Sequence, residues 1–134
     1  MSFTKLCEQL EAKIQKTYEE GTTLEEAEKL AAEFLGAMMK VSSELKAKDL
    51  DSRMKKSGVK AVRAAAYLDI VQKTEKKPTE TQIASMIDTD DLVSNEQYGL
   101  DKAEVERDDL KRYYDIFQNA HVFYRGVAKG SFSA

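Results

Sequence analysis

The chain has 134 residues, a length typical of one domain with its own core, and a formal net charge of −3. One proline, six glycines and no tryptophan fit an all-α protein better than a β-sandwich or barrel. No apolar run reaches the roughly 18 residues that would indicate a membrane span, and "MSFTKLCEQLEAK" lacks the apolar centre of a signal peptide. The single Cys7 cannot form an internal disulfide, so we expect a cytoplasmic protein.

The charge is segregated along the chain. Between Arg53 and Lys77 there are eight basic and two acidic residues, whereas between Pro78 and Glu106 there are one basic and eight acidic residues. The small net charge therefore hides a basic region. The acidic regions are predicted either to dock on basic segments of neighbouring subunits or to limit indiscriminate binding to nucleic acid.

The first half of the chain predicts two helices. A short amphipathic helix over residues 3–18 ends at Gly21. A capping box of Thr23 and Glu26 then opens a long helix that reaches about Lys73. Its expected apolar stripe consists of Leu24, Ala27, Ala31, Phe34, Met38, Val41 and Leu45.

The second half predicts a short helix followed by a long one. Pro78 ends the preceding helix, and Thr79 with Gln82 forms a capping box at the start of "TETQIASMID". We expect "DTDDLVSNEQ" to be a connector or bend, and the final helix to begin at about Ser94 or Asp101. Its expected apolar stripe consists of Leu110, Tyr113, Phe117, Ala120 and Tyr124, with Ile116 and Phe123 beside it.

The predicted long helix is too long for a compact globule. A continuous helix from Thr23 to Lys73 would measure about 75 Å, whereas a compact chain of this size has a diameter of about 36 Å. Either the helix breaks at Ser57-Gly58, or the chain is extended. We favour a single all-α domain over residues 1–134, an elongated helical hairpin, with residues 1–77 forming its first half and 78–134 its second.

The final helix predicts self-assembly. Its last turns carry Val122, Phe123, Tyr124 and Val127 around the helix rather than on one stripe, and a helix that is apolar on several sides needs cover on several sides. We therefore expect a homo-oligomer larger than a dimer, held by the segment from Leu110 to Phe132. The residues expected at this interface are Leu110, Tyr113, Phe117, Phe123, Tyr124 and Val127.

The sequence carries few signals of catalysis or of a bound metal. His121 has no companion histidine or cysteine, which argues against a zinc site, and Cys7 lies near Glu8 and Glu11, which do not favour a thiolate. "DTDD" at 88–91 lacks the glycine and terminal glutamate of a calcium loop. We expect no enzyme activity, no cofactor and no metal, with His121 in packing or an interface hydrogen bond.

A basic stripe is the main candidate for function. Arg53, Lys56, Lys60, Arg63 and Tyr67 follow one another at steps of three and four, which places them on one helix face. Such a stripe is most often only a solvated face. A row of cations that ends in an aromatic ring is also typical of sequence-independent binding to single-stranded nucleic acid, where cations track phosphates and the ring stacks on a base.

Three stretches carry a further signal: "VKAVRAAAYLD" (59–69), "IASMIDTDDLV" (83–93) and "FYRGVAKGSF" (123–132). Together they resemble the UvsY-type recombination mediators of T-even-like bacteriophages. The family's motif resembles Leu-Lys-Ala-Arg-Leu-Asp. It aligns either on Lys60 and Arg63 or on Leu68-Asp69, and the second alignment places Ala66 and Tyr67 at the basic positions.

The resemblance implies a non-enzymatic function in DNA recombination and repair. Members are helical homo-oligomers that bind single-stranded DNA and assemble through their C-terminal region. They help a RecA-like recombinase to load onto DNA coated by single-strand-binding protein. In this case the protein would work in the cytoplasm of the host cell. The alternative is a helical phage structural or adaptor protein with no nucleic-acid role, in which the basic stripe is a wet face or docks an acidic partner.

Overall fold

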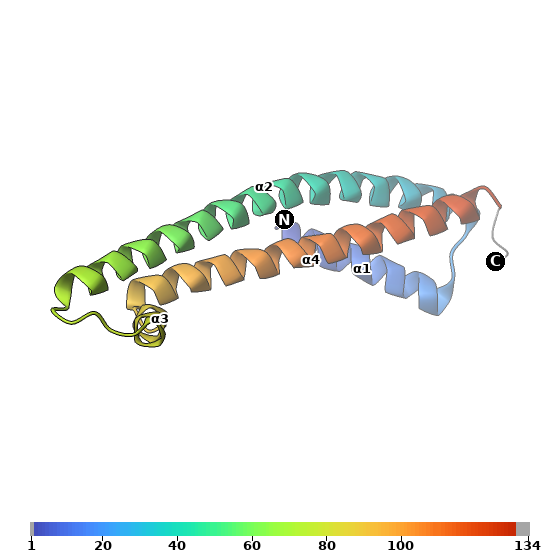
Figure 1. Cartoon of the computed structure of the whole chain (residues 1–134). Coiled ribbons are helices and arrows are strands. Elements are labelled where there is room, and N and C mark those ends of the chain that lie inside the picture. The colour runs from blue at the N-terminus through green and yellow to red at the C-terminus, as the bar shows by residue number, and fades with distance from the viewer. Residues whose placement is uncertain (1, 131–134) are drawn as a thin grey trace. The chain divides into compact units, whose positions relative to one another are not determined.

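A computed structural model describes residues 2–130, and all of its regular elements in that range are helices (Figure 1). They are α1 (Phe3–Glu20), α2 (Leu24–Lys73), α3 (Glu80–Asp88) and α4 (Asp91–Ala128). The two long helices, α2 and α4, pack against each other as a helical hairpin, which confirms the predicted fold class. No helix within residues 2–130 combines the length and apolarity needed to cross a membrane.

The ends of the first helix follow from local chemistry. The Ser2 hydroxyl accepts a hydrogen bond from the Lys5 amide at 3.2 Å and so satisfies an N–H that has no partner within α1. At the other end Gly21 has φ +77°, a left-handed conformation that costs glycine little, and its amide donates to the Thr17 carbonyl at 2.7 Å. The predicted end at Gly21 is confirmed.

Helix α2 runs without a break through Ser57-Gly58, so the break considered at this point is absent. Glycine in a helix interior costs about 1 kcal/mol relative to alanine, and tertiary packing overrides this preference. A Cβ at position 58 would lie 3.4 Å from a carboxylate oxygen of Glu96 on α4. This is an ordinary contact distance to a flexible side chain, so Gly58 lies in a continuous helix beside α4 and is not a hinge.

The predicted start of the last helix was wrong. α4 begins at Asp91, so only Thr89 and Asp90 separate it from α3. The Asp90 carboxylate accepts a hydrogen bond from the Val93 amide at 3.1 Å, and its carbonyl accepts from Ser94. "DTDD" therefore contains a helix N-cap, a common role for aspartate that the acidic run concealed.

By their contacts, the described residues form two compact units. Unit 1 comprises the residues up to Leu45 and those from Asp109 onward, and unit 2 comprises Lys46–Asp108. Each unit contains part of α2 and part of α4. Unit 1 adds α1, and unit 2 adds α3.

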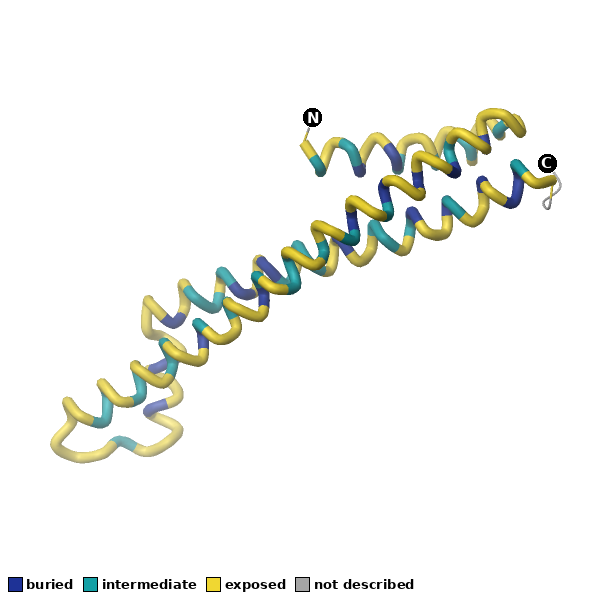
Figure 2. Tube along the Cα trace, turned by 90° about the horizontal axis from the view of Figure 1, so that it is seen from above, coloured by how far each residue is buried: buried dark blue, intermediate teal, exposed yellow. Residues whose placement is uncertain are grey.

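Unit 1 has an aromatic core. Phe34 of α2 lies between Phe117 and Tyr124 of α4, with both ring centroids at 5.5 Å from its own. Cys7 and Leu10 bring α1 into the same cluster. Buried positions recur along the helices at the expected spacing (Figure 2).

Most of the stripe predicted for α2 contributes to this core. Ala27, Ala31, Phe34 and Val41 are buried, and Met38 and Leu45 are partly buried against them. Leu24 is the exception, since it is 61% exposed. It is the first residue of α2.

Unit 2 has a smaller aliphatic core. Ile83 and Ile87 of α3 and Val93 of α4 are buried together. The contact between α2 and α4 in this unit is partly polar. The Lys48 ammonium pairs with Glu106, and the Arg107 guanidinium donates to the Ser52 hydroxyl at 3.4 Å. The predicted capping box of Thr79 and Gln82 is confirmed at the start of α3.

Candidate nucleic-acid interface

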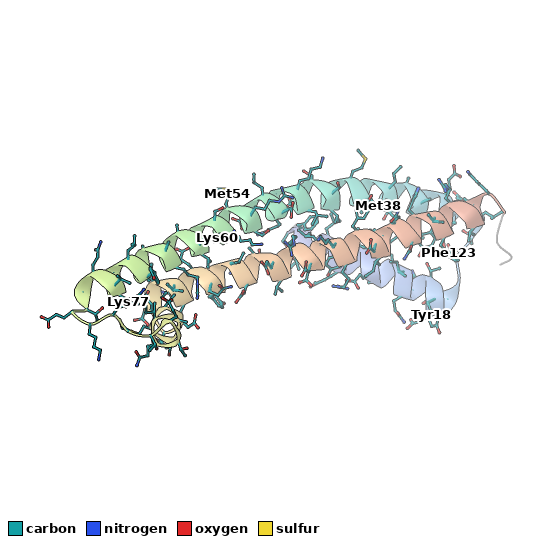
Figure 3. All side chains as sticks on the ribbon, viewed as in Figure 1. Tyr18, Met38, Met54, Lys60, Lys77 and Phe123 are labelled. Atoms are coloured by element: carbon teal, nitrogen blue, oxygen red, sulfur yellow. The ribbon has the colours of Figure 1, made fainter. Side chains whose placement is uncertain are left out.

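The predicted basic stripe lies entirely on α2 within unit 2. Lys56 and Lys60 are exposed, and neither makes an ion pair with any residue of the described range. Arg53 is exposed as well, although its guanidinium lies 3.0 Å from Asp49 one turn earlier. Figure 3 labels Lys60 on this helix. An exposed pair of this kind is worth little, so Arg53 remains available to another anion.

Arg63 has a different role from its neighbours in the stripe. Its guanidinium donates to the Asp88 carboxylate of α3 at 3.0 Å, and its side chain is only 40% exposed. The ion pair joins α2 to the end of α3 and offsets the positive charge. We therefore count Arg63 as a structural residue that lies beside the open stripe.

Tyr67 is not an open stacking platform. Its half-buried ring packs against the cluster of Ile83, Ile87 and Val93. Its phenol lies near the Lys77 ammonium: Tyr67 first, and then Glu80, raises the pKa of Lys77 above its ordinary value. The sequence left open whether Tyr67 stacks or packs, and the structure shows packing, mainly against α3.

Two exposed residues near the stripe were missed. Lys46 precedes Arg53 by seven residues, as Arg53 precedes Lys60, so all three lie along one side of α2. Tyr98 is 70% exposed and lines an open hollow with Arg63 and Asp101. The seven-residue repeat was a visible signal for Lys46, whereas Tyr98 lies between the two expected starts of the last helix, Ser94 and Asp101.

Most residues predicted to hold an oligomer are used inside the chain. Leu110, Phe117, Tyr124 and Val127 are buried in unit 1. In this packing they present no surface to a partner, because α1 covers the second apolar side of α4. The predicted segment also includes Phe132, which lies outside the described residues.

Two of the predicted interface residues keep some exposed surface. Phe123 is 44% exposed. Tyr113 is half-buried, and the Arg112 guanidinium lies 4.6 Å from the centre of its ring. The Tyr113 ring also contacts Phe117, so its free surface is small.

The remaining side chains that the sequence singled out, His121, Cys7 and the carboxylates of "DTDD", have structural roles. A ring nitrogen of His121, Nδ1, lies 2.8 Å from the Ala31 carbonyl oxygen, which joins α4 to α2 in unit 1. Cys7 is buried, and burial, followed by Glu11 and Glu8, raises the pKa of its thiol. The "DTDD" carboxylates cap α4 and bind Arg63, as described above. No group of three or more histidine, cysteine or acidic side chains in the described part is placed to hold a metal ion.

Comparisons with protein-family models, with curated proteins and with solved structures found no significant match, so the resemblance to UvsY-type mediators remains a prediction from the sequence.

Proposed function

We propose that this chain binds the sugar-phosphate backbone of single-stranded DNA through Arg53, Lys56 and Lys60. The supporting observation is the exposure of three cations on one face of α2, two of which have no ion-pair partner among the described residues. Phosphate contacts of this kind require flexible cations rather than a shaped pocket. They give affinity without base specificity.

The expected binding is mainly electrostatic. Because Tyr67 packs against α3, the stripe lacks the aromatic ring that would stack on a base, and we assign it no stacking contribution. Each phosphate contact on a single strand contributes about 0.7 to the dependence of log affinity on log salt. One chain therefore binds weakly.

The biological role that we propose is recombination mediation. A protein that holds the DNA backbone without reading bases leaves the base edges accessible, as a recombinase requires. Assistance to a RecA-like recombinase on DNA coated by single-strand-binding protein rests on the resemblance of residues 59–69, 83–93 and 123–132. Nothing in this role requires catalysis by the chain itself.

The test is fluorescence anisotropy with labelled oligo-dT over a range of salt concentrations. Replacing both lysines, Lys56→Ala with Lys60→Ala, should weaken binding and make the salt slope shallower by about 1.4 for each engaged chain. Tyr67→Ala should lower thermal stability more than affinity, since its ring lies in the unit 2 core.

A matched control removes the same charge elsewhere. Lys40→Ala with Lys111→Ala changes two exposed lysines of unit 1 and has the same effect on net charge. It should keep the wild-type slope. If the control and the stripe variant lose affinity equally, net charge and not the stripe determines binding. Wild-type affinity and slope in the stripe variant would exclude the proposed site.

The second candidate is an adaptor with no nucleic-acid role. It is favoured by apolar side chains that α2 turns to solvent in unit 2: Leu50 is 61% exposed, Met54 65% and Leu68 57%. A face of this kind is typical of protein–protein contacts. Failure of the full-length chain to bind oligo-dT at low salt would favour this candidate.

A further inference from the structure

Exposed apolar residues and one serine of α2 in unit 2 form a regular seam. The seam alternates in steps of four and three residues, the spacing of a coiled-coil contact. Met54 is labelled on it in Figure 3. All of its members are exposed, and they are Leu50, Met54, Ser57, Ala61, Ala64 and Leu68.

The seam is separate from the surface by which α2 contacts α4 in unit 2. That contact uses the buried Ser52 and Val59 and the Lys48–Glu106 ion pair. Large side chains at both ends of the seam and small ones in its middle allow another helix to approach closely. No described residue covers it.

A second exposed apolar face lies on α4 of the same unit. Tyr98 is 70% exposed and Val105 is 61% exposed, and they are seven residues apart, so they lie on one side of the helix. Asp101 and Asp108 are also exposed and seven residues apart, along the same side. We call these four residues the α4 face.

The two surfaces are complementary in charge and in period. Along the α2 seam, Arg53 and Lys60 form a cationic edge with a seven-residue repeat, and Asp101 and Asp108 form an anionic edge with the same repeat. Their present partners are partly exposed neighbours on their own helices, such as Asp49 for Arg53 and Arg107 for Asp108 at 3.3 Å. Exchanging such weak pairs for partners on another chain costs little.

We propose that a second copy of this chain occupies the α2 seam with its α4 face. One chain carries both surfaces, so each copy has one seam and one face to offer. Such a head-to-tail contact produces a ring if its rotation closes and a filament if it does not. The contact also explains why a nearly neutral chain separates its basic and acidic residues. The contact uses Arg53 and Lys60, which the proposed DNA binding also uses, so self-association and DNA binding compete for these two side chains, and association is measured without DNA.

Charge reversal on either surface tests the pairing. One variant combines Arg53→Glu with Lys60→Glu, and the other combines Asp101→Lys with Asp108→Lys. In sedimentation without DNA, the wild type should self-associate at micromolar concentration. Each variant alone should associate at least about tenfold more weakly, because like charges then face each other.

The equimolar mixture of the two variants is the decisive measurement. The reversed seam of one variant is complementary to the reversed face of the other, and their unreversed surfaces also match, so mixing should restore association to near the wild-type level. If the mixture stays monomeric, the pairing of seam with face is wrong. If the Asp101/Asp108 variant associates like the wild type, seam-to-seam contact or the C-terminal helix is responsible.

An uncharged change tests the apolar part. Met54→Gln should weaken association, whereas Met39→Gln, which changes a 70% exposed methionine of α2 in unit 1, should not. Circular dichroism should show wild-type thermal midpoints for all variants, since every changed side chain is exposed. A wild type that is monomeric at high micromolar concentration overturns the proposal, whatever oligo-dT binding shows.

Discussion

The two units differ in the side chains that form their cores. Unit 1 places Phe34, Phe117 and Tyr124 in one stacked cluster that α1 closes. Unit 2 buries a few aliphatic side chains under α3 and leaves Leu50, Met54 and Leu68 on its surface. The same two helices therefore supply an aromatic core in unit 1 and a smaller aliphatic core in unit 2. The basic stripe, the α2 seam and the α4 face all belong to unit 2.

The largest expected effect is a loss of stability from the unit 1 core. Phe34→Ala removes a fully buried ring that contacts two other rings, so it should lower the free energy of unfolding by about 3–5 kcal/mol. Leu35→Ala is the matched control, because the neighbouring Leu35 is 47% exposed and should cost less than about 1 kcal/mol. Denaturant unfolding measures both. Equal losses would contradict the aromatic core described for unit 1.

A smaller loss is expected from the unit 2 core. Ile83→Ala should lower the free energy of unfolding by about 2 kcal/mol, the lower end of the range for such truncations, because its cluster is smaller than that of unit 1. Met86→Ala, at a 45% exposed position of the same helix, serves as the control. Amide hydrogen exchange should accelerate in α3 and stay unchanged in α1. Acceleration in both helices would show that the units open together.

A single hydrogen bond in unit 1 gives the third prediction. The Tyr124 hydroxyl lies 2.7 Å from that of Thr17, which joins α4 to α1. Tyr124→Phe should cost about 1 kcal/mol, the usual net value of one such bond. Tyr114→Phe is the control, since no hydrogen bond of its hydroxyl exists within the described residues. If the two variants unfold at the same denaturant concentration, this bond does not stabilise unit 1.

The smallest effect is expected at the Lys48–Glu106 ion pair of unit 2. The hydrogen bond from Lys48 is the main cause that lowers the pKa of Glu106 below its ordinary value of 4.5. A lowered pKa in the folded state means that the stabilisation is present above pH 4.5 and is lost as the pH falls through the lower value. Glu106→Gln should therefore cost less than about 1 kcal/mol at neutral pH, because both side chains are more than a third exposed.

The pH dependence distinguishes this pair from a general charge effect. The difference in unfolding free energy between wild type and Glu106→Gln should shrink as the pH is lowered below 4.5. Glu104→Gln, which removes a carboxylate that has no ion pair within the described range, should follow the wild-type acid profile. A constant difference across the acid range would show that Glu106 contributes through packing and not through its charge.

The helix ends could be predicted where a side chain signals them locally. Thr79 with Gln82 forms the expected capping box, and Gly21 takes the left-handed conformation that ends α1. Asp90 was missed because an aspartate among other acids is read as a solvated connector. Its role as the N-cap of α4 depends on one hydrogen bond to Val93, which composition does not reveal.

The sequence by itself determined that this protein is a helical hairpin and which helix faces are apolar. Helical periodicity is a property of one segment, so Ala27, Ala31 and Phe34 were recognisable as core residues before any partner was known. Tertiary structure alone decided what covers each face. The aromatic end of α4 predicted an oligomer, but α1 of the same chain covers Phe117 and Tyr124, while Arg63 and Tyr67 turn to α3. Periodicity shows that a face needs cover; only the packed chain shows whether it already has it.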